Sequence, residues 1–204
     1  MSVVEDRLQL ADWRRTVAEM YATIRHEKNK RIAWQLFQNT RDDLFLNHPQ
    51  TPLNAAQKAN FSGLDYFAYN PEFAVMGRLD KIASHNHYKV ELPKDGRFRF
   101  TRIAKVHFNI KKQPLTLDLY WVEGYGGGLF LPFRDATNGT TTYGGGRYLY
   151  DAIKGADLGA EEDSILLDFN FAYNPSCAYN DQWVCPLAPQ ENWLDFAIEA
   201  GEKL

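Results

Sequence analysis

Long hydrophobic runs are absent from this 204-residue chain. No window approaches the roughly 20 apolar residues that a helix needs to cross a bilayer, which argues against a membrane protein of that kind. A surplus of basic residues is also absent, because the formal net charge is −3 and the pI is about 6.0. This balance argues against nucleic acid or an anionic membrane as a partner. Segment 1–15 carries charges where a secretory signal has its apolar core, so we expect a cytoplasmic protein.

Cysteine is scarce, with residues only at positions 177 and 185. A redox motif has two intervening residues and a zinc ribbon has four ligands in two close pairs, so neither template fits. Three interpretations stay open: buried structural thiols, a disulfide that closes a short loop, and a nucleophile at one cysteine. A reducing cytoplasm disfavours the disulfide, and a nucleophile needs a neighbouring base or cation. We predict that Cys177 and Cys185 are reduced and bind no metal.

Helical periodicity dominates residues 1–60. Apolar residues at helical spacing form one stripe, with basic residues off it. The stripe consists of Trp13, Val17, Met20, Tyr21 and Ile24. A second helix is predicted over 28–45. It should end before Pro49, because the residue that precedes a proline avoids the α region. Thr51 and Pro52 predict the N-cap and first position of a third helix that runs to Ala59.

A period of two takes over in residues 73–204, which we expect to be mainly β. The even positions of 97–111 are apolar apart from Arg102, and the odd positions are mostly polar, as in a long half-buried strand. The expected core residues there are Phe98, Phe100, Ala104, Val106, Phe108 and Ile110. A three-residue loop at 94–96 predicts a hairpin that pairs Leu92 with Phe98 and Val90 with Phe100, and sets Glu91 opposite Arg99.

The next strand follows at 115–121, where Leu117, Leu119 and Trp121 are predicted to face the core. Further strands are expected at 128–133, 146–150, 164–171 and 193–199. Helices followed by antiparallel strands indicate an α+β protein. We predict a single domain over 1–204, with amino-terminal helices packed on a curved, mainly antiparallel sheet or barrel of about seven strands.

Two Tyr-Gly-Gly-Gly segments, at 125–128 and 143–146, predict backbone with positive φ or a close approach to another segment. Arg134 and Arg147 flank the second of these segments and the loop that begins at Asp135. Guanidinium groups and exposed N–H groups of a glycine-rich loop can clamp a small anion. The alternative is a hairpin that Asp and Asn cap, with Arg134 paired to Asp135 or Asp168. Neither segment is a nucleotide-binding phosphate loop, because the lysine and hydroxyl are missing.

Polar and aromatic side chains are concentrated in 168–192. Asp168 and Asn170 would share one face of a strand, with Phe169 and Phe171 on the other. The segment also contains Tyr173, Asn174, Tyr179, Glu191 and Asn192. So many polar and aromatic side chains in a short segment favour a lined pocket over a solvent-exposed strand face. Glu191 is the candidate general acid or base.

Three histidines, at positions 85, 87 and 107, are predicted on one polar strand face. Three imidazoles suffice for a catalytic zinc. The hairpin register, however, sets Lys105 opposite His85, which disfavours a cation. We therefore predict no metal there and no cofactor.

Two segments, FLPFRDATNGTTTYGGGRYL and DFNFAYNPSCAYNDQWVCPLAPQENWLDFAIEAGE, carry a family resemblance. The chain resembles the bacterial and archaeal domain-of-unknown-function family sixteen-eighty-four over nearly its whole length. The resemblance also includes the helix at Trp13, LFLNHPQTPL at 44–53 and GLDYF at 63–67. It implies no activity, cofactor or substrate.

The sequence favours binding of a small polar or anionic metabolite in a pocket. The predicted ligand-binding residues are Arg134, Asp135, Tyr143, Arg147, Asp168, Asn170, Tyr173 and Asn174. We predict that Arg134, Arg147, Asp168 and Asn174 converge on one polar cavity. The alternatives are an enzyme that uses Cys177 or Glu191 in that pocket, and a structural or interaction module without ligand. Neither nucleic acid nor membrane is expected as a partner, and the oligomeric state is left open.

Overall fold

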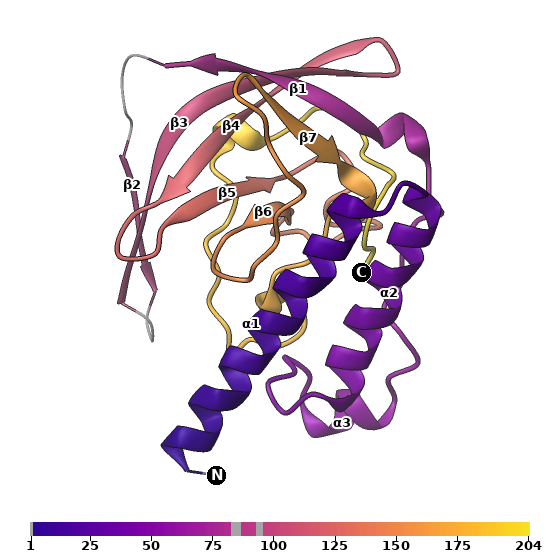
Figure 1. Cartoon of the computed structure of the whole chain (residues 1–204), viewed down its shortest axis with the longest axis vertical. Coiled ribbons are helices and arrows are strands. Elements are labelled where there is room, and N and C mark those ends of the chain that lie inside the picture. The colour runs from indigo at the N-terminus through magenta and orange to yellow at the C-terminus, as the bar shows by residue number, and fades with distance from the viewer. Residues whose placement is uncertain (1, 83–86, 93–95) are drawn as a thin grey trace.

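The computed structural model describes residues 2–82, 87–92 and 96–204. Three helices come first: α1 (Val3–His26), α2 (Lys30–Asn47) and the short α3 (Ala55–Ala59). Seven strands follow: β1 (Ala74–Lys81), β2 (His87–Leu92), β3 (Gly96–Ile110), β4 (Gln113–Val122), β5 (Gly128–Phe133), β6 (Arg147–Asp151) and β7 (Ser164–Asp168). The predicted α+β class, with amino-terminal helices on a curved antiparallel sheet, is confirmed (Figure 1).

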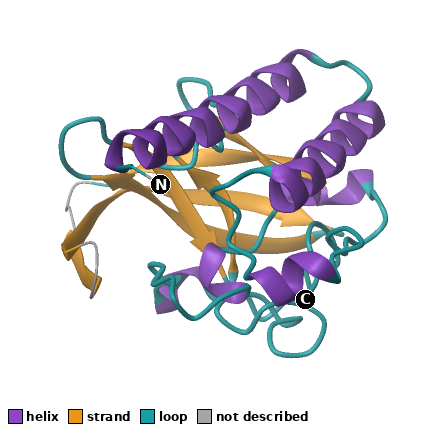
Figure 2. Ribbon diagram, turned by 90° about the horizontal axis from the view of Figure 1, so that it is seen from below, coloured by secondary structure: helices purple, strands orange, loops and turns teal. Residues whose placement is uncertain are grey.

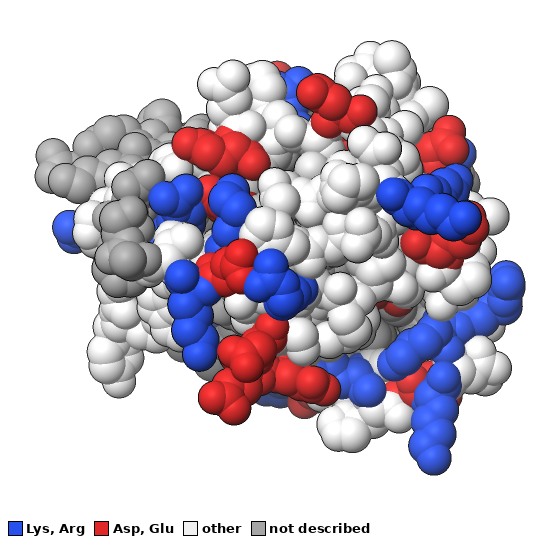
Figure 3. Space-filling view, turned by 90° about the horizontal axis from the view of Figure 1, so that it is seen from above, with Lys and Arg blue, Asp and Glu red and all other residues white. Residues whose placement is uncertain are grey.

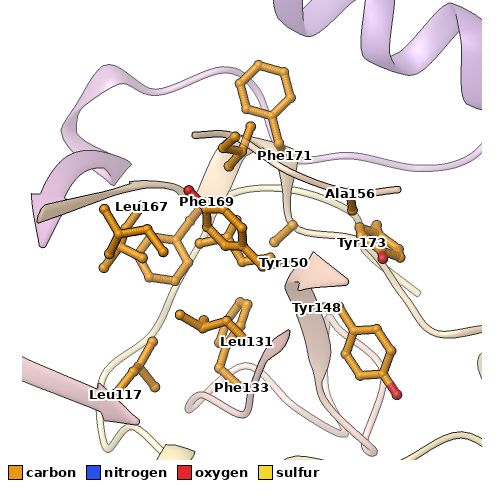
Figure 4. Close-up of a cluster of buried hydrophobic side chains, with 14 of the residues drawn as sticks. Leu117, Leu131, Phe133, Tyr148, Tyr150, Ala156, Leu167, Phe169, Phe171 and Tyr173 are labelled. Carbon is orange, nitrogen blue, oxygen red and sulfur yellow. The ribbon is translucent and has the colours of Figure 1, made fainter. Parts of the chain in front are cut away.

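The sheet is antiparallel at every strand pair, in the order β6-β5-β4-β3-β1-β7, with β2 also paired to β3. It curls into a half-barrel. The helices α1 and α2 lie across one side of it (Figure 2). The hydrophobic core fills the space inside the curl, where side chains of β4 to β7 and the segment after β7 meet (Figure 4).

The apolar stripe of α1 faces this core as predicted. Val17, Met20, Tyr21 and Ile24 are buried, and α2 adds Phe37, whose ring contacts Tyr21 and Phe171 edge-on. Burying each such side chain stabilises the fold by roughly 1.5–3 kcal/mol. Packing, rather than helix propensity, therefore holds α1 and α2 on the sheet.

The third helix begins three residues later than predicted. Asn54, not Thr51, is its N-cap and forms a capping box with Gln57. The hydroxyl of Thr51 instead donates to the carbonyl of Phe45, 2.7 Å away, and accepts the N–H of Leu53. Thr51 thus caps the turn that follows α2. Its hydroxyl still accepts a backbone N–H, as an N-cap does, but in this turn and not at the start of α3.

The hairpin of β2 and β3 has a register two residues away from the predicted one. Val90 pairs with Phe98, Tyr88 with Phe100, and Glu91 with Arg97. A shift of two keeps each residue on its predicted face, because side chains alternate with a period of two. The even positions Phe100, Ala104, Val106, Phe108 and Ile110 are buried as expected, whereas Phe98 is only half-buried.

Trp121 was predicted in the core, and this prediction is wrong: its exposed fraction is 44%. The β3–β4 register shifts between Arg102 and Ala104, where β3 carries one extra residue. Leu117 and Leu119 face the core before this bulge, and Tyr120 and Val122 face it afterwards. A bulge shifts the alternation of inward and outward side chains on one strand relative to its partner, and Trp121 therefore points outward.

One predicted strand is absent, and another is shorter than predicted. Residues 193–199 form no ladder; they run beside Arg134 through one parallel bridge and the hydrogen bond from Leu194 N to Arg134 O, 2.9 Å. The strand predicted at 164–171 stops at Asp168, and a 3-10 turn, Phe169–Phe171, follows. In this turn all side chains are buried, so the predicted division of 168–171 into a polar and an apolar face does not occur.

Candidate functional site

Arg147 begins β6 and is completely buried. Its Nη2 donates to Asp135 Oδ2 at 2.8 Å and to the carbonyl of Ile198 at 2.9 Å. Its Nη1 donates to the carbonyls of Ala200 and Glu202. Desolvation lowers the Arg147 pKa from its usual range, while Asp135 opposes that shift. The guanidinium therefore ties the carboxy-terminal segment to the sheet.

Asp135 caps the turn that follows β5. Its Oδ1 accepts hydrogen bonds from the N–H and hydroxyl of Thr137 and from the N–H of Ile198. The side chain of Asn138 accepts the N–H of Asp135 at 2.6 Å. Arg134 pairs with neither Asp135 nor Asp168; its guanidinium lies 4.2 Å from the Trp193 ring centroid. The glycine-rich loop thus has the Asx-type capping that the structural alternative predicts.

Asp168 and Asn170 join two distant turns. Asp168 Oδ1 accepts the N–H and the side-chain amide of Asn170. Asn170 in turn exchanges two hydrogen bonds of 2.9 Å with the backbone of Asn70. Burial raises the pKa of Asp168 to about 6, although the hydrogen bonds from Asn170 act in the opposite direction.

The predicted convergence of Arg134, Arg147, Asp168 and Asn174 on one cavity is wrong. Asn174 lines a cavity between the helices and the sheet, and the other three residues do not line it. Buried polar groups need partners, and Arg147 and Asp168 find theirs in backbone and neighbouring side chains at separate places. Of the eight predicted ligand-binding residues, the cavity contains only Tyr173 and Asn174.

That cavity has a volume of about 590 Å³ and lies among α1, α2, the concave side of the sheet and segment 173–186. In Figure 1 the upper part of α1 runs past β6 and the orange loop that follows it. Its walls are mainly aromatic and aliphatic. The aromatic members are Trp13, Tyr21, Phe45, Phe98, Phe130, Tyr148, Tyr173, Tyr179 and Trp183. Its size and lining are typical of a small-molecule site.

Few polar groups reach this apolar interior. Asp151, at the end of β6, accepts the N–H groups of Ile153 and Lys154 and, at 3.4 Å, the hydroxyl of Tyr173. Burial raises the Asp151 pKa above its usual range. The Tyr21 hydroxyl and Asn174 Oδ1 are buried and have no hydrogen-bond partner among the described residues. Both residues contribute to the cavity lining, but these two atoms have almost no accessible surface, so the cavity is bounded there mainly by the rest of each side chain.

Arg41 of α2 closes the cavity on the side of the carboxy terminus. Its Nη2 donates to Glu202 at 2.7 Å and its Nε to the hydroxyl of Tyr66 at 3.0 Å. The guanidinium also lies 5.0 Å from the Tyr173 ring centroid. Tyr179 donates a short hydrogen bond to the same Glu202 carboxylate. The charge of Arg41 is therefore neutralised inside the protein.

Arg7, Arg14 and Lys154 also line the cavity, and none of them forms an ion pair with a described residue. Lys154 Nζ contacts Ser176 Oγ at 3.4 Å and lies 5.9 Å from the Trp183 ring centroid. Its charge is felt by Asp151, but the two groups are not in ion-pair contact. Arg7 and Arg14 are exposed on α1 and mark the opening. The carboxylate of Asp6 also lines the cavity, beside Arg7, and accepts the side-chain amide of Gln50 at 2.9 Å. The cavity thus combines an apolar interior with a predominantly basic rim.

Cys177 and Cys185 are free, half-buried thiols. Cys185 lines the cavity and Cys177 does not; the Cys177 sulfur lies 3.6 Å from the hydroxyl of Tyr143. Glu191 lies elsewhere: it is exposed and accepts the hydroxyl of Tyr88 at 3.1 Å. The two candidate reactive groups of the sequence therefore belong to different places.

A family model described as "Protein of unknown function (DUF1684)" matches residues 59–203. The chain belongs to this family. It is also similar to an uncharacterized protein of Haloarcula marismortui whose solution NMR structure is known, with 33% sequence identity and a TM-score of 0.62. That similarity covers 85% of this chain and 94% of the archaeal chain. No curated protein matches.

The outer side of the sheet in this family member carries both signs of charge. Figure 3 shows basic and acidic side chains close together on the face seen from above. Buried Asp118 pairs with Arg102 and Lys105, and Asp80 pairs with Arg78 and, at 2.9 Å, with His107. His87 contacts Glu123 instead, and His85 lies outside the described residues. None of the helices in the described ranges is both long enough and apolar enough to span a membrane.

Sequence reasoning missed the residues of α1 and α2 at this cavity. The stripe of α1 marks Trp13, Val17 and Tyr21 as apolar contacts, but nothing local distinguishes a residue that packs on the core from one that lines a cavity. Arg7 and Arg14 are ordinary exposed helix residues in the sequence. Their role at the rim depends on where the distant segment 173–186 returns to α1.

Proposed function

We propose that this protein binds a small amphipathic organic anion in the cavity between the helices and the sheet. The apolar body of the ligand contacts the aromatic walls, and its acidic head group lies at the rim near Arg7, Arg14 and Lys154. One observation carries the proposal: a cavity of about 590 Å³ with mainly apolar walls has three cations at it that form no ion pair with a described residue. Apolar pockets with a few convergent polar groups are the usual form of such sites.

The proposal moves the ligand away from the glycine-rich loop. It keeps Tyr173 and Asn174 of the predicted ligand-binding set and adds Tyr21 to the aromatic walls that contact the ligand. A free cation at the surface is common, but three around one apolar opening favour an anion, because opposite charges attract strongly where solvent is partly displaced. Arg41 contributes little net attraction, since Glu202 neutralises it.

Thermal unfolding with a matched ligand series tests this function. Decanoate should raise the melting temperature in a concentration-dependent manner, because it binds the folded state only. Acetate, which has the head group without the apolar body, should have no effect at equal concentration. Decanol, which has the body without the charge, should have a smaller effect than decanoate. Equal effects of decanoate and decanol would refute the role of the basic rim, and no shift with either would refute the apolar site.

A further inference from the structure

Cys177 and Cys185 are separated by seven residues in the sequence and interact with each other in the fold. Cys177 lies in the 3-10 turn Ser176–Ala178, and Cys185 follows Trp183 and Val184 on the cavity wall. The thiol and the backbone N–H of Cys185 both interact with the Cys177 sulfur. The two thiols are therefore neighbours in space, although their sequence spacing matches no common redox motif.

The surroundings of Cys177 favour a thiolate. Hydrogen bonding from the Cys185 thiol lowers the Cys177 pKa to about 6, with the Tyr143 hydroxyl acting in the same direction and burial opposing. The Cys185 pKa is raised, first by its interaction with Cys177 and then by burial. The other ionisable groups near this cluster are Tyr148, Lys154 and Asp181. One sulfur of the pair is thus prepared as a nucleophile, and the other stays protonated beside it.

We infer that Cys177 and Cys185 form a reversible dithiol–disulfide couple, with Cys177 as the reactive thiol and Cys185 as the resolving thiol. Two contacts carry this assignment: the adjacent thiols and the Tyr143 hydroxyl at 3.6 Å from Cys177. The assignment is independent of what the cavity binds.

The oxidant of the proposed reaction is a hydroperoxide. The Cys177 thiolate attacks the terminal peroxide oxygen, the O–O bond breaks, and the products are a sulfenic acid and, after protonation, an alcohol or water. The sulfur of Cys185 then attacks the Cys177 sulfur, its proton leaves with the hydroxyl as water, and the disulfide forms. A dithiol reductant returns both sulfurs to thiols by exchange. Because Cys185, Trp183 and Val184 line the cavity, the bond would fix that wall.

Intact mass under denaturing, non-reducing conditions tests the couple. Treatment of the native protein with a small molar excess of hydrogen peroxide should lower the monomer mass by two hydrogen atoms, and dithiothreitol should restore it. Cys185→Ser should instead accumulate a sulfenic acid that dimedone labels at position 177. Cys177→Ser should be oxidised by hydrogen peroxide much more slowly than the wild type, and dimedone should not label it. A monomer mass without this loss, or a disulfide found only between chains, would overturn the assignment.

The pH dependence of alkylation distinguishes a Cys177 thiol with a lowered pKa from a thiol of ordinary pKa that merely lies near Cys185. Iodoacetamide should modify Cys177 with a rate midpoint near pH 6. At that pH the rate should be roughly 10-fold above that of a small reference thiol, because the larger thiolate fraction outweighs the lower nucleophilicity. Tyr143→Phe, which keeps the ring and removes the donor, should move the midpoint upward. A midpoint at or above 8 in the wild type would contradict the proposed role of Cys177.

Discussion

Arg147 and Asp135 form an ion pair of 2.8 Å in which neither side chain is accessible to solvent. The pair connects β6 to the turn after β5, and the same guanidinium holds three carbonyl groups of the carboxy-terminal segment. The two residues were predicted at a ligand site, yet these contacts occupy both terminal nitrogens of Arg147 and both carboxylate oxygens of Asp135 within the protein. Arg147, which the sequence suggested as a binding group for an anion, instead holds backbone carbonyl groups in place.

Removing this guanidinium should destabilise the fold strongly. We expect Arg147→Ala to lower the free energy of unfolding by about 3–5 kcal/mol, because it leaves Asp135 and several carbonyls buried without their donor. Arg134→Ala is the matched control: it removes the same side chain from a half-buried stacking contact and should cost about 0.5–1 kcal/mol. Urea denaturation of both variants measures the difference. Equal losses would show that Arg147 has no special structural role.

The two triple-glycine segments allow a matched test of why glycine is present. Gly126 and Gly146 both have φ of +93°, but a Cβ at Gly126 would meet nothing within 4 Å, whereas one at Gly146 would lie 2.5 Å from the carbonyl oxygen of Phe133. Gly126→Ala should therefore cost only the backbone strain, roughly 1–2 kcal/mol. Gly146→Ala should cost roughly 1–3 kcal/mol more, because the strands must separate. Similar costs in denaturant unfolding would argue against the close approach.

Asp168 should make the protein less stable as the pH rises. Its pKa is about 6 in the folded state and near 3.9 when unfolded, so between these values the folded state holds a proton that the unfolded state has lost. The contribution of Asp168 to stability is therefore largest below about pH 4 and decreases through pH 6, by about 3 kcal/mol in all.

The variant Asp168→Asn isolates this contribution, since the amide oxygen can still accept the N–H of Asn170. The stability of the variant and the wild type should diverge between pH 4 and pH 6, with the variant the more stable of the two above pH 6. Thermal unfolding across this range measures the divergence. Parallel curves would mean that Asp168 titrates normally.

The basic rim predicts how affinity responds to charge and salt. Lys154→Ala and Arg14→Ala should each weaken decanoate binding about 5-fold, which corresponds to about 1 kcal/mol for a partly exposed ion pair. The difference should narrow in 0.5 M NaCl, because salt screens exposed charges. Lys28→Ala removes an exposed cation outside the cavity lining and serves as the control. Calorimetric titration that finds all three variants alike would exclude head-group recognition by the rim.

Periodicity predicted the elements that local sequence determines. The stripe of α1 and the even positions of β3 are buried because burial of one face dictates both patterns. The outward turn of Trp121 was not predictable, since it depends on a bulge in the neighbouring strand. The partners of Arg147 could not be assigned either: the sequence contains several carboxylates, and only the path of the chain selects Asp135.

The cavity was harder to predict than the fold, because its residues are brought together only by the path of the chain. Tyr173 and Asn174 come from the compositionally unusual segment that the sequence marks as a site, but Tyr21, Arg14 and Arg41 come from helices with ordinary amphipathic patterns. Cys177 and Cys185 were correctly expected as free thiols. Their proximity to each other and to Tyr143 is a property of the folded chain.

Crystals of the protein grown with 10-bromodecanoate test the central claim most directly, because the anomalous signal of bromine locates the ligand without assumptions. We predict one bromine site among the aromatic side chains near Tyr21 and Phe130, with the carboxylate toward Lys154 and the α1 arginines. At a ligand concentration close to the wild-type Kd, the signal should weaken strongly when Lys154 and Arg14 are both replaced by alanine. Bromine located elsewhere on the protein, or none in the cavity at a saturating concentration, would contradict the proposed function.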